Sequence, residues 1–229
     1  MTEDEPVTSA SQASGPAPVR GEHRWPMAVA ATVAIVLTVL LPNGVRAGPR
    51  WALLAAGLLL VAVIVADPGH IDGQRKLVRL LSLAMLAMLI VTALASTLLL
   101  IHLLIKGGGV TKSGPRLLLV GNGVLVINII VFALLYWELD GGGPAARAHR
   151  KPLYPDLAFP QHMNPELAPA GWRPLFFDYL YLGLTASVAF SPTDTMPMVP
   201  WAKTAMGAQS LISIAILGLV IARAVNIFA

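Results

Sequence analysis

Six stretches of the chain contain no Asp, Glu, Lys or Arg, and apolar residues dominate each of them. A helix needs about 20 apolar residues to cross a hydrocarbon core about 30 Å thick, and about 17 is near the lower limit. Three stretches meet this length, two are shorter but still predicted to span, and the fifth in order is the shortest. In chain order they are residues 25–41, 51–66, 80–105, 117–137, 179–190 and 204–222.

This pattern predicts an all-α, polytopic membrane helix bundle. Stretch 179–190 is too short to span unless residues 175–178 extend its helix. Two architectures therefore follow: six transmembrane helices, or five plus a re-entrant helix of the pore type. We favour six spans.

The positions of the five tryptophans support membrane insertion. Trp25 and Trp51 begin apolar stretches, Trp137 ends one, and Trp172 and Trp201 lie just ahead of the last two. Indole prefers the headgroup level of a bilayer, where its ring is shielded and its N–H reaches water. A soluble core would instead distribute tryptophan through the middle of its elements.

Four regions follow from the distribution of apolar, proline and glycine residues. Residues 1–24 are rich in Pro, Ser, Ala and Thr, have few large apolar side chains, and are predicted to be a disordered tail. Residues 25–137 form a four-helix transmembrane region. Residues 138–174 form a Pro/Gly-rich loop in which the prolines prevent a continuous helix, and residues 175–229 form a helical hairpin.

The first apolar stretch also has features of a cleavable signal peptide. Basic residues precede it, and Val45-Arg46-Ala47 is typical of a cleavage site. We favour an uncleaved first span, because the preceding tail is long and a second apolar stretch follows within a short loop.

Composition agrees with a membrane protein and excludes several kinds of chemistry. Hydrophobic residues make up 56% and charged residues 12% of the chain, about half the charge of a soluble domain, and the mean hydropathy is +0.71. The absence of cysteine excludes disulfides, thiolate metal sites and thiol catalysis. The net charge is +4, and the basic residues lie in short loops beside the apolar stretches. Membrane topology and anionic headgroups explain these residues better than binding to nucleic acid.

The positions of Lys and Arg give an orientation. With six spans, ten of them fall on the side of the N-terminal tail and six on the other, so both termini are predicted in the cytoplasm and residues 191–203 outside. With a re-entrant fifth helix, only Lys203 and Arg223 exchange sides. The split stays ten to six, but residues 191–203 then lie on the cytoplasmic side.

The C-terminal region carries residues found in potassium-channel pores. Asp178, Leu180 and Tyr181 match the D-x-L-Y with which a channel pore helix commonly starts. Asp194 and Pro197 match the Asp and Pro that follow the filter, and a long apolar helix comes next. This hairpin therefore resembles the pore module of a bacterial potassium channel, which implies channel ancestry.

The filter itself departs from that family. Its Gly-Tyr-Gly is Ser191-Pro192-Thr193 here, followed by Asp194. A potassium filter stacks backbone carbonyls around the ion, its glycines permit that backbone, and Pro192 fixes φ. We therefore expect no potassium-type selectivity. The alternative is an ordinary helix hairpin whose turn supplies an N-cap and a helix breaker.

A larger part of the chain resembles a bacterial family of integral membrane proteins of unknown function. The resemblance is carried by residues 137–144, 178–181, 190–197 and 222–226. It implies the same kind of C-terminal hairpin, and no activity.

Polar side chains at membrane depth are the remaining candidates for function. They include Asn122 and Asn128 in the fourth stretch and Gln209 in the last, while His102 lies near the end of the third. Amides also bond between helices, typically for about 0.6 kcal/mol. We expect Asn122 and Asn128 to be packing residues and His102 to reach the membrane surface.

No residue set indicates catalysis, and neither a cofactor nor a metal site is expected. The first functional hypothesis is passage of an ion or small solute without potassium-type selectivity. The second is a non-conducting membrane scaffold or accessory subunit that binds a partner through residues 138–174. The bilayer and a second copy of the chain are the expected partners. The bias toward Ala, Val, Gly and Pro indicates a bacterium with a GC-rich genome, and hence a location in the bacterial plasma membrane.

Overall fold

Each uncharged stretch forms a helix in the computed structural model, which describes residues 22–66, 76–107, 109–149, 154–188 and 194–228. The all-α fold is confirmed. The only strands assigned within these ranges have two residues each: β1 (Leu157–Ala158) and β2 (Met196–Pro197). The long helices are α1 (Trp25–Leu40), α2 (Arg50–Ala66), α3 (Lys76–Lys106), α4 (Gly114–Leu139), α7 (Phe176–Val188) and α8 (Pro200–Phe228).

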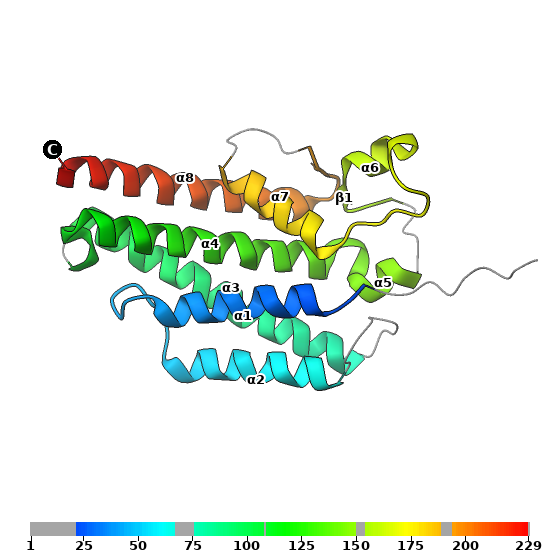
Figure 1. Cartoon of the computed structure of the whole chain (residues 1–229), viewed down its shortest axis with the longest axis horizontal. Helices are drawn as coiled ribbons and strands as arrows, with labels where there is room; N and C mark the ends of the chain where they lie inside the picture. Colours follow the sequence, from blue (N-terminus) through cyan, green and yellow to red (C-terminus); the bar gives the residue numbers. More distant parts are fainter. Residues whose placement is uncertain (1–21, 67–75, 108, 150–153, 189–193, 229) are drawn as a thin grey trace, which may run out of the picture.

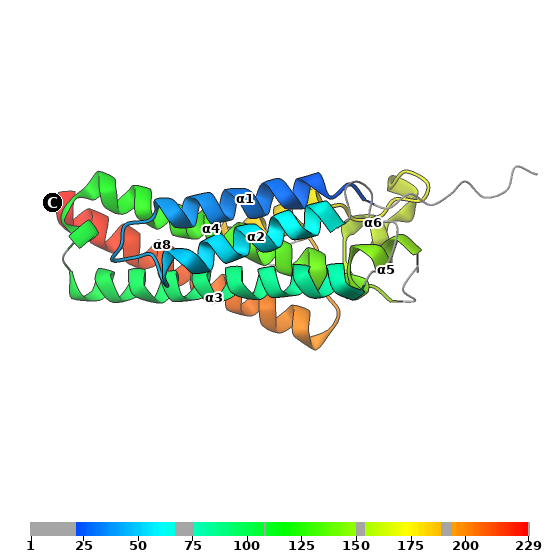
Figure 2. The same cartoon turned by 90° about the horizontal axis from the view of Figure 1, so that it is seen from below.

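Helix α4 is the centre of the bundle. It packs against α7 and α8 on one side and against α1 and α3 on the other, with α2 outermost (Figures 1 and 2). In the apolar segment of α4 that could cross a membrane, 72% is buried within the protein, against 39% of the corresponding segment of α3 and 22% of that of α8. A helix that is apolar on every side is suited to this position, because all of its faces meet protein.

Among the described residues, three helices are long and apolar enough to cross a membrane, as in a membrane protein. They are α3 with 31 residues, α4 with 26 and α8 with 29. At 1.5 Å per residue each exceeds the roughly 30 Å of a hydrocarbon core. Helices α1 and α2, with 16 and 17 residues, lie near the lower limit.

Helix α7 does not carry the chain to the opposite end of the bundle. Its 13 residues give a length of about 20 Å, and it ends well short of the C-terminal end of α8 (Figure 1). The chain then returns, because β2 pairs antiparallel with β1 and the Met198 N–H donates to the Asp156 carbonyl at 2.9 Å. With six spans, residues 191–203 were expected at the opposite end from residues 138–174. For the described residues 194–203 this expectation is wrong, and α7 has the geometry of the re-entrant alternative.

The predicted loop 138–174 is folded into a cap on one end of the bundle. Within its described part the prolines do prevent a long helix, and Pro160 and Pro165 each begin a short one, as proline favours. Positive φ angles of 58°, 82° and 96° at Gly141, Gly142 and Gly143 turn the chain sharply out of α4. The cap contains η2 (Asp140–Gly142), α5 (Pro144–His149), β1, α6 (Pro160–Met163) and η3 (Pro165–Leu167).

The end of the predicted disordered tail is also folded. Glu22 bonds to α4 and α7, and the side chain of Arg24 is buried. Residues 1–21 lie outside the described residues. The end of the bundle that carries this segment and the cap is called the cap end below.

Candidate functional site

The structure does not bring the predicted polar candidates into one site. Asn122 is exposed on the surface of α4. Asn128 and Gln209 are fully buried, but Asn128 bonds to α3 and Gln209 bonds to Tyr136 of α4. Of the filter-like turn, Asp194 is exposed, and Ser191, Pro192 and Thr193 lie outside the described residues.

Gln209 joins three helices through its carboxamide. It accepts a hydrogen bond from the Tyr136 hydroxyl of α4 at 2.6 Å. Its amide nitrogen donates to the Gly183 carbonyl at 2.7 Å and to Ser187 Oγ at 2.8 Å, both on α7. The half-length helix α7 is thus fastened to α4 and α8 by polar bonds in an apolar interior, where an unpaired group is costly.

Close packing seals α7 against α4 beside this network. A Cβ placed on Gly183 would lie 2.9 Å from the Ile129 carbonyl oxygen. Only glycine permits this approach, and it is the kind of small-residue contact that drives helix association in membranes.

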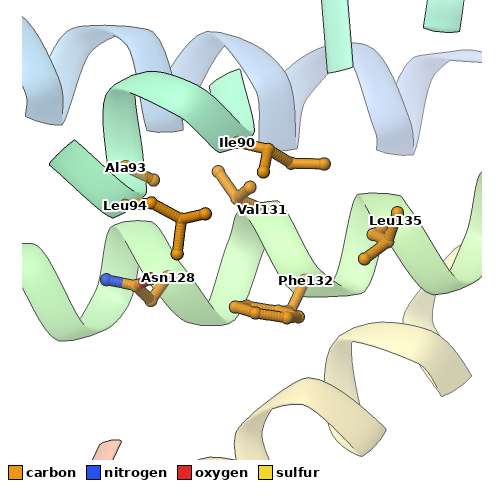
Figure 3. Close-up of a pocket in the computed structure, with 7 residues that line it drawn as sticks. All are labelled: Ile90, Ala93, Leu94, Asn128, Val131, Phe132 and Leu135. Atoms are coloured by element: carbon orange, nitrogen blue, oxygen red, sulfur yellow. The ribbon is translucent and has the colours of Figure 1, made fainter. Parts of the chain in front are cut away.

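Asn128 acts as a packing residue between α3 and α4. Its Nδ2 donates to Thr97 Oγ1 at 2.8 Å and to the Val124 carbonyl at 2.9 Å. Its Oδ1 has no partner. Figure 3 shows Asn128 at the edge of a small cavity whose other six lining residues are apolar, namely Ile90, Ala93, Leu94, Val131, Phe132 and Leu135.

The densest polar cluster lies at the cap end and is centred on Asp140. Oδ2 of Asp140 accepts the Tyr179 hydroxyl at 2.5 Å, and Oδ1 accepts the Leu157 N–H of β1 at 3.1 Å. Its side chain is 3% exposed. One carboxylate therefore fixes the end of α4, the first turn of α7 and the cap strand.

Arg147 closes this cluster from α5. Its Nη1 donates to the carbonyls of Asp140 at 2.6 Å and Trp137 at 2.7 Å, near the end of α4. Its guanidinium carbon lies 5.0 Å from the centre of the Tyr179 ring, within cation–π range. A cation at a helix C-terminus is also favourable, because backbone carbonyls without a partner collect there.

Glu22 ties the N-terminal segment to the same place. Its carboxylate accepts the Trp137 indole N–H at 2.8 Å and the Phe176 N–H, the first amide of α7, at 2.5 Å. Burial raises the pKa of the Glu22 carboxyl, and these two hydrogen bonds oppose the shift. The carboxylate thus complements the N-terminus of α7.

Aromatic rings fill the space between the cap and α7. Phe159 packs edge-on against Tyr179 with ring centres 5.3 Å apart, and Trp172 packs against His162 at 5.2 Å. Asp156 accepts the Gly141 N–H at 3.0 Å and so holds the glycine turn. The cap is therefore a packed unit rather than a flexible loop.

The sequence alone did not identify this cluster. From their position directly after Trp137, Glu138 and Asp140 are expected at the headgroup level. The structure instead buries both residues. Nothing in the sequence placed Tyr179, Arg147 or Glu22 beside them. The available signal was the group of acids and glycines directly after Trp137. Asp178 borders the fifth apolar stretch, where an acid is expected to begin a helix and complement its dipole. In the structure it lies in the first turn of α7 and accepts the Leu175 N–H at 2.7 Å.

The hydrogen bonds of the cluster indicate a structural role, because they hold α4, α7, the cap and the N-terminal segment together. The acceptors of Glu22, Asp140 and Asp156 are used by protein donors. Within the described ranges, no group of three or more His, Cys, Asp or Glu residues could hold a metal ion. No family model, curated protein or solved structure matches the chain.

Proposed function

We propose that this protein is a non-conducting scaffold or accessory subunit of a bacterial plasma membrane. In this proposal α1, α2, α3, α4 and α8 cross the bilayer and α7 is re-entrant. The ten-to-six distribution of Lys and Arg puts the cap end in the cytoplasm.

The way α7 is fastened carries the proposal. The polar groups of α7 that face the bundle bond to the protein, through Gln209 at its middle and Asp140 at its start. A conducting path needs polar groups that face water or the ion. Gly183 closes the contact with α4 in addition.

The cap supplies a surface for a partner. Tyr154 is 79% exposed and Leu167 is 81% exposed, while the cap beneath them is held by Asp140 and Arg147. Tyrosine is among the residues that most often anchor protein interfaces, and Tyr154 is such a residue on a rigid support.

Two measurements on the purified and the cellular protein test the proposal. Liposomes containing the protein should pass K⁺, Na⁺ and small neutral solutes no faster than empty liposomes. A photo-reactive amino acid at Leu167 should form a discrete protein adduct in cells that Tyr154→Ser abolishes, and the same probe at Lys112 should not. Flux above the empty control, or equal adducts from both positions, would overturn the proposal.

A second candidate is passage of an ion or small solute along an axis formed by several copies of the hairpin. One observation favours it: α7 enters from the cap end and the chain returns to that end before α8, as a pore helix and inner helix do. Flux that requires an oligomer and is lost on disrupting α7 would select this candidate.

A further inference from the structure

Charge is distributed unevenly between the two ends of the bundle. The connections 41–50 and 106–116 and the C-terminal segment 223–229 hold six of the sixteen Lys and Arg residues and none of the twelve Asp and Glu residues. The rest of the chain holds ten basic and twelve acidic residues. We call the first set of segments the basic end, with a formal charge of +6 against −2 elsewhere.

Contacts join these segments into one surface. The guanidinium of Arg223, from the end of α8, lies over the last turn of α3, where a Cβ on Gly107 would be 2.9 Å from its Nη2. A Cβ on Gly44, between α1 and α2, would be 3.8 Å from a Leu103 methyl of α3. Figure 1 shows the three segments at the end opposite the cap.

Two of the arginines have structural roles there. Arg46 donates to the Val39 carbonyl at 3.2 Å and to Asn43 Oδ1 at 2.7 Å, which closes the end of α1. Arg223 places its positive charge at the C-terminus of α3, where Gly107 with φ +76° ends the helix. No Asp or Glu side chain of these segments pairs with either of them, because the segments contain neither residue.

Three of the other basic side chains face outward. Lys106, Lys112 and Arg116 are exposed, and His102 is exposed one helical turn before Lys106. Apolar side chains lie directly beside them on the same helices: Ile105 is 71% exposed and Leu119 is 75% exposed. A basic rim above an exposed apolar wall is the arrangement that accommodates the headgroup and acyl chain of one lipid.

We propose that the basic end binds anionic phospholipid, with Lys106, Lys112 and Arg116 contacting the headgroup phosphates. Charge complementarity and continuity with the lipid-facing wall identify the occupant. An acidic soluble protein would meet the same charge but would leave Ile105 and Leu119 without an apolar partner. This inference rests on the arrangement of the bundle and holds whether or not the protein conducts.

Retention of phosphatidylglycerol during native mass spectrometry tests it. Protein from nanodiscs with equal phosphatidylglycerol and phosphatidylcholine should retain the anionic lipid in preference. The triple variant Lys106→Gln, Lys112→Gln and Arg116→Gln should lose that preference by about tenfold or more, since each basic residue near the surface contributes on the order of 1 kcal/mol.

A matched control removes the same charge from the cap end. Lys76, Arg79 and Lys203 are exposed, and changing all three to Gln should leave the preference intact. Equal loss from both triple variants, or no loss from the first, would overturn the proposal. So would complete competition by inorganic phosphate, which would identify a free-anion site. Because Lys106, Lys112 and Arg116 are exposed, the first triple variant should keep the melting temperature of the wild type.

Discussion

A single carboxamide, that of Gln209, connects α4, α7 and α8. Replacing it with Leu leaves the Tyr136 hydroxyl, the Ser187 hydroxyl and the Gly183 carbonyl without that partner. A buried group left unpaired costs about 1–3 kcal/mol, although polar bonds in membrane interiors average less, about 0.6 kcal/mol. We expect Gln209→Leu to lower the free energy of unfolding in detergent by about 1–3 kcal/mol.

Asn122→Leu is the matched control for this change. Asn122 is exposed on α4, so the same replacement there should leave the free energy of unfolding unchanged or raise it. An equal loss of unfolding free energy in the two variants would show that the hydrogen bonds of Gln209 do not stabilise the contact between α4, α7 and α8.

Glu22 makes the stability of the cap end depend on pH. Its folded pKa is raised above the ordinary value of 4.5 by burial. In the pH interval between these two pKa values the unfolded chain releases a proton that the folded protein keeps, so stability falls as pH rises and is greatest below the ordinary value. The melting temperature should therefore decrease through this interval.

Glu22→Gln should make this decrease shallower, because the amide does not titrate. A part of the decrease should remain, since burial also raises the pKa of the Asp140 carboxyl. Glu166 is exposed, and Glu166→Gln should keep the wild-type slope. Melting curves of the three proteins in detergent over an acid-to-neutral pH series provide the measurement. A wild-type slope in Glu22→Gln would assign the pH dependence to another group.

At the scale of elements, helix α7 depends on one close approach. A methyl group on Gly183 would lie 2.9 Å from the Ile129 carbonyl, so Gly183→Ala should push α7 away from α4 and cost about 1–3 kcal/mol of unfolding free energy. Gly207 of α8 has no atom within 4 Å of the equivalent point. Gly207→Ala should therefore be neutral or stabilising by up to about 1 kcal/mol, as in an open helix. Thermal unfolding of both variants in the same detergent measures the two changes in stability. An unchanged melting temperature for Gly183→Ala would show that the close contact between α7 and α4 does not require glycine.

The sequence predicted the helices well because the lack of charge marks them directly. The stretch 117–137 became α4 with its ends at Gly114 and Leu139. From the sequence, the return of the chain after α7 followed only as the second of two architectures. The apolar pattern could not decide between them, because the return depends on the pairing of two-residue strands distant in sequence, and such short strands carry no periodic pattern. Asp140 was read as a headgroup-level acid, since its burial depends on Tyr179 and Leu157, which the sequence does not place beside it.

At the scale of the whole molecule, the two ends differ in structure and in charge. The cap end holds a packed unit of short helices fastened to α4 and α7 by Asp140, Arg147 and Glu22. The basic end consists of short connections with no acidic residue. Because of this asymmetry, we propose a different binding partner for each end. The cap end binds a protein, and the basic end binds anionic lipid.

The proposed re-entrant course of the hairpin predicts which residues share a side of the membrane. The native chain has no cysteine, so single cysteines can be placed without background. Leu167 in the cap and Asp194 after α7 are both exposed, as is Lys112 at the basic end. A membrane-impermeant thiol reagent added to whole cells should label Lys112→Cys and neither Leu167→Cys nor Asp194→Cys, because the latter two share the end that the Lys and Arg distribution puts in the cytoplasm. Labelling of all three after permeabilisation confirms that each is accessible. The reverse pattern would invert the orientation and keep the hairpin, whereas Leu167→Cys and Asp194→Cys reacting from opposite sides would show that α7 crosses the bilayer.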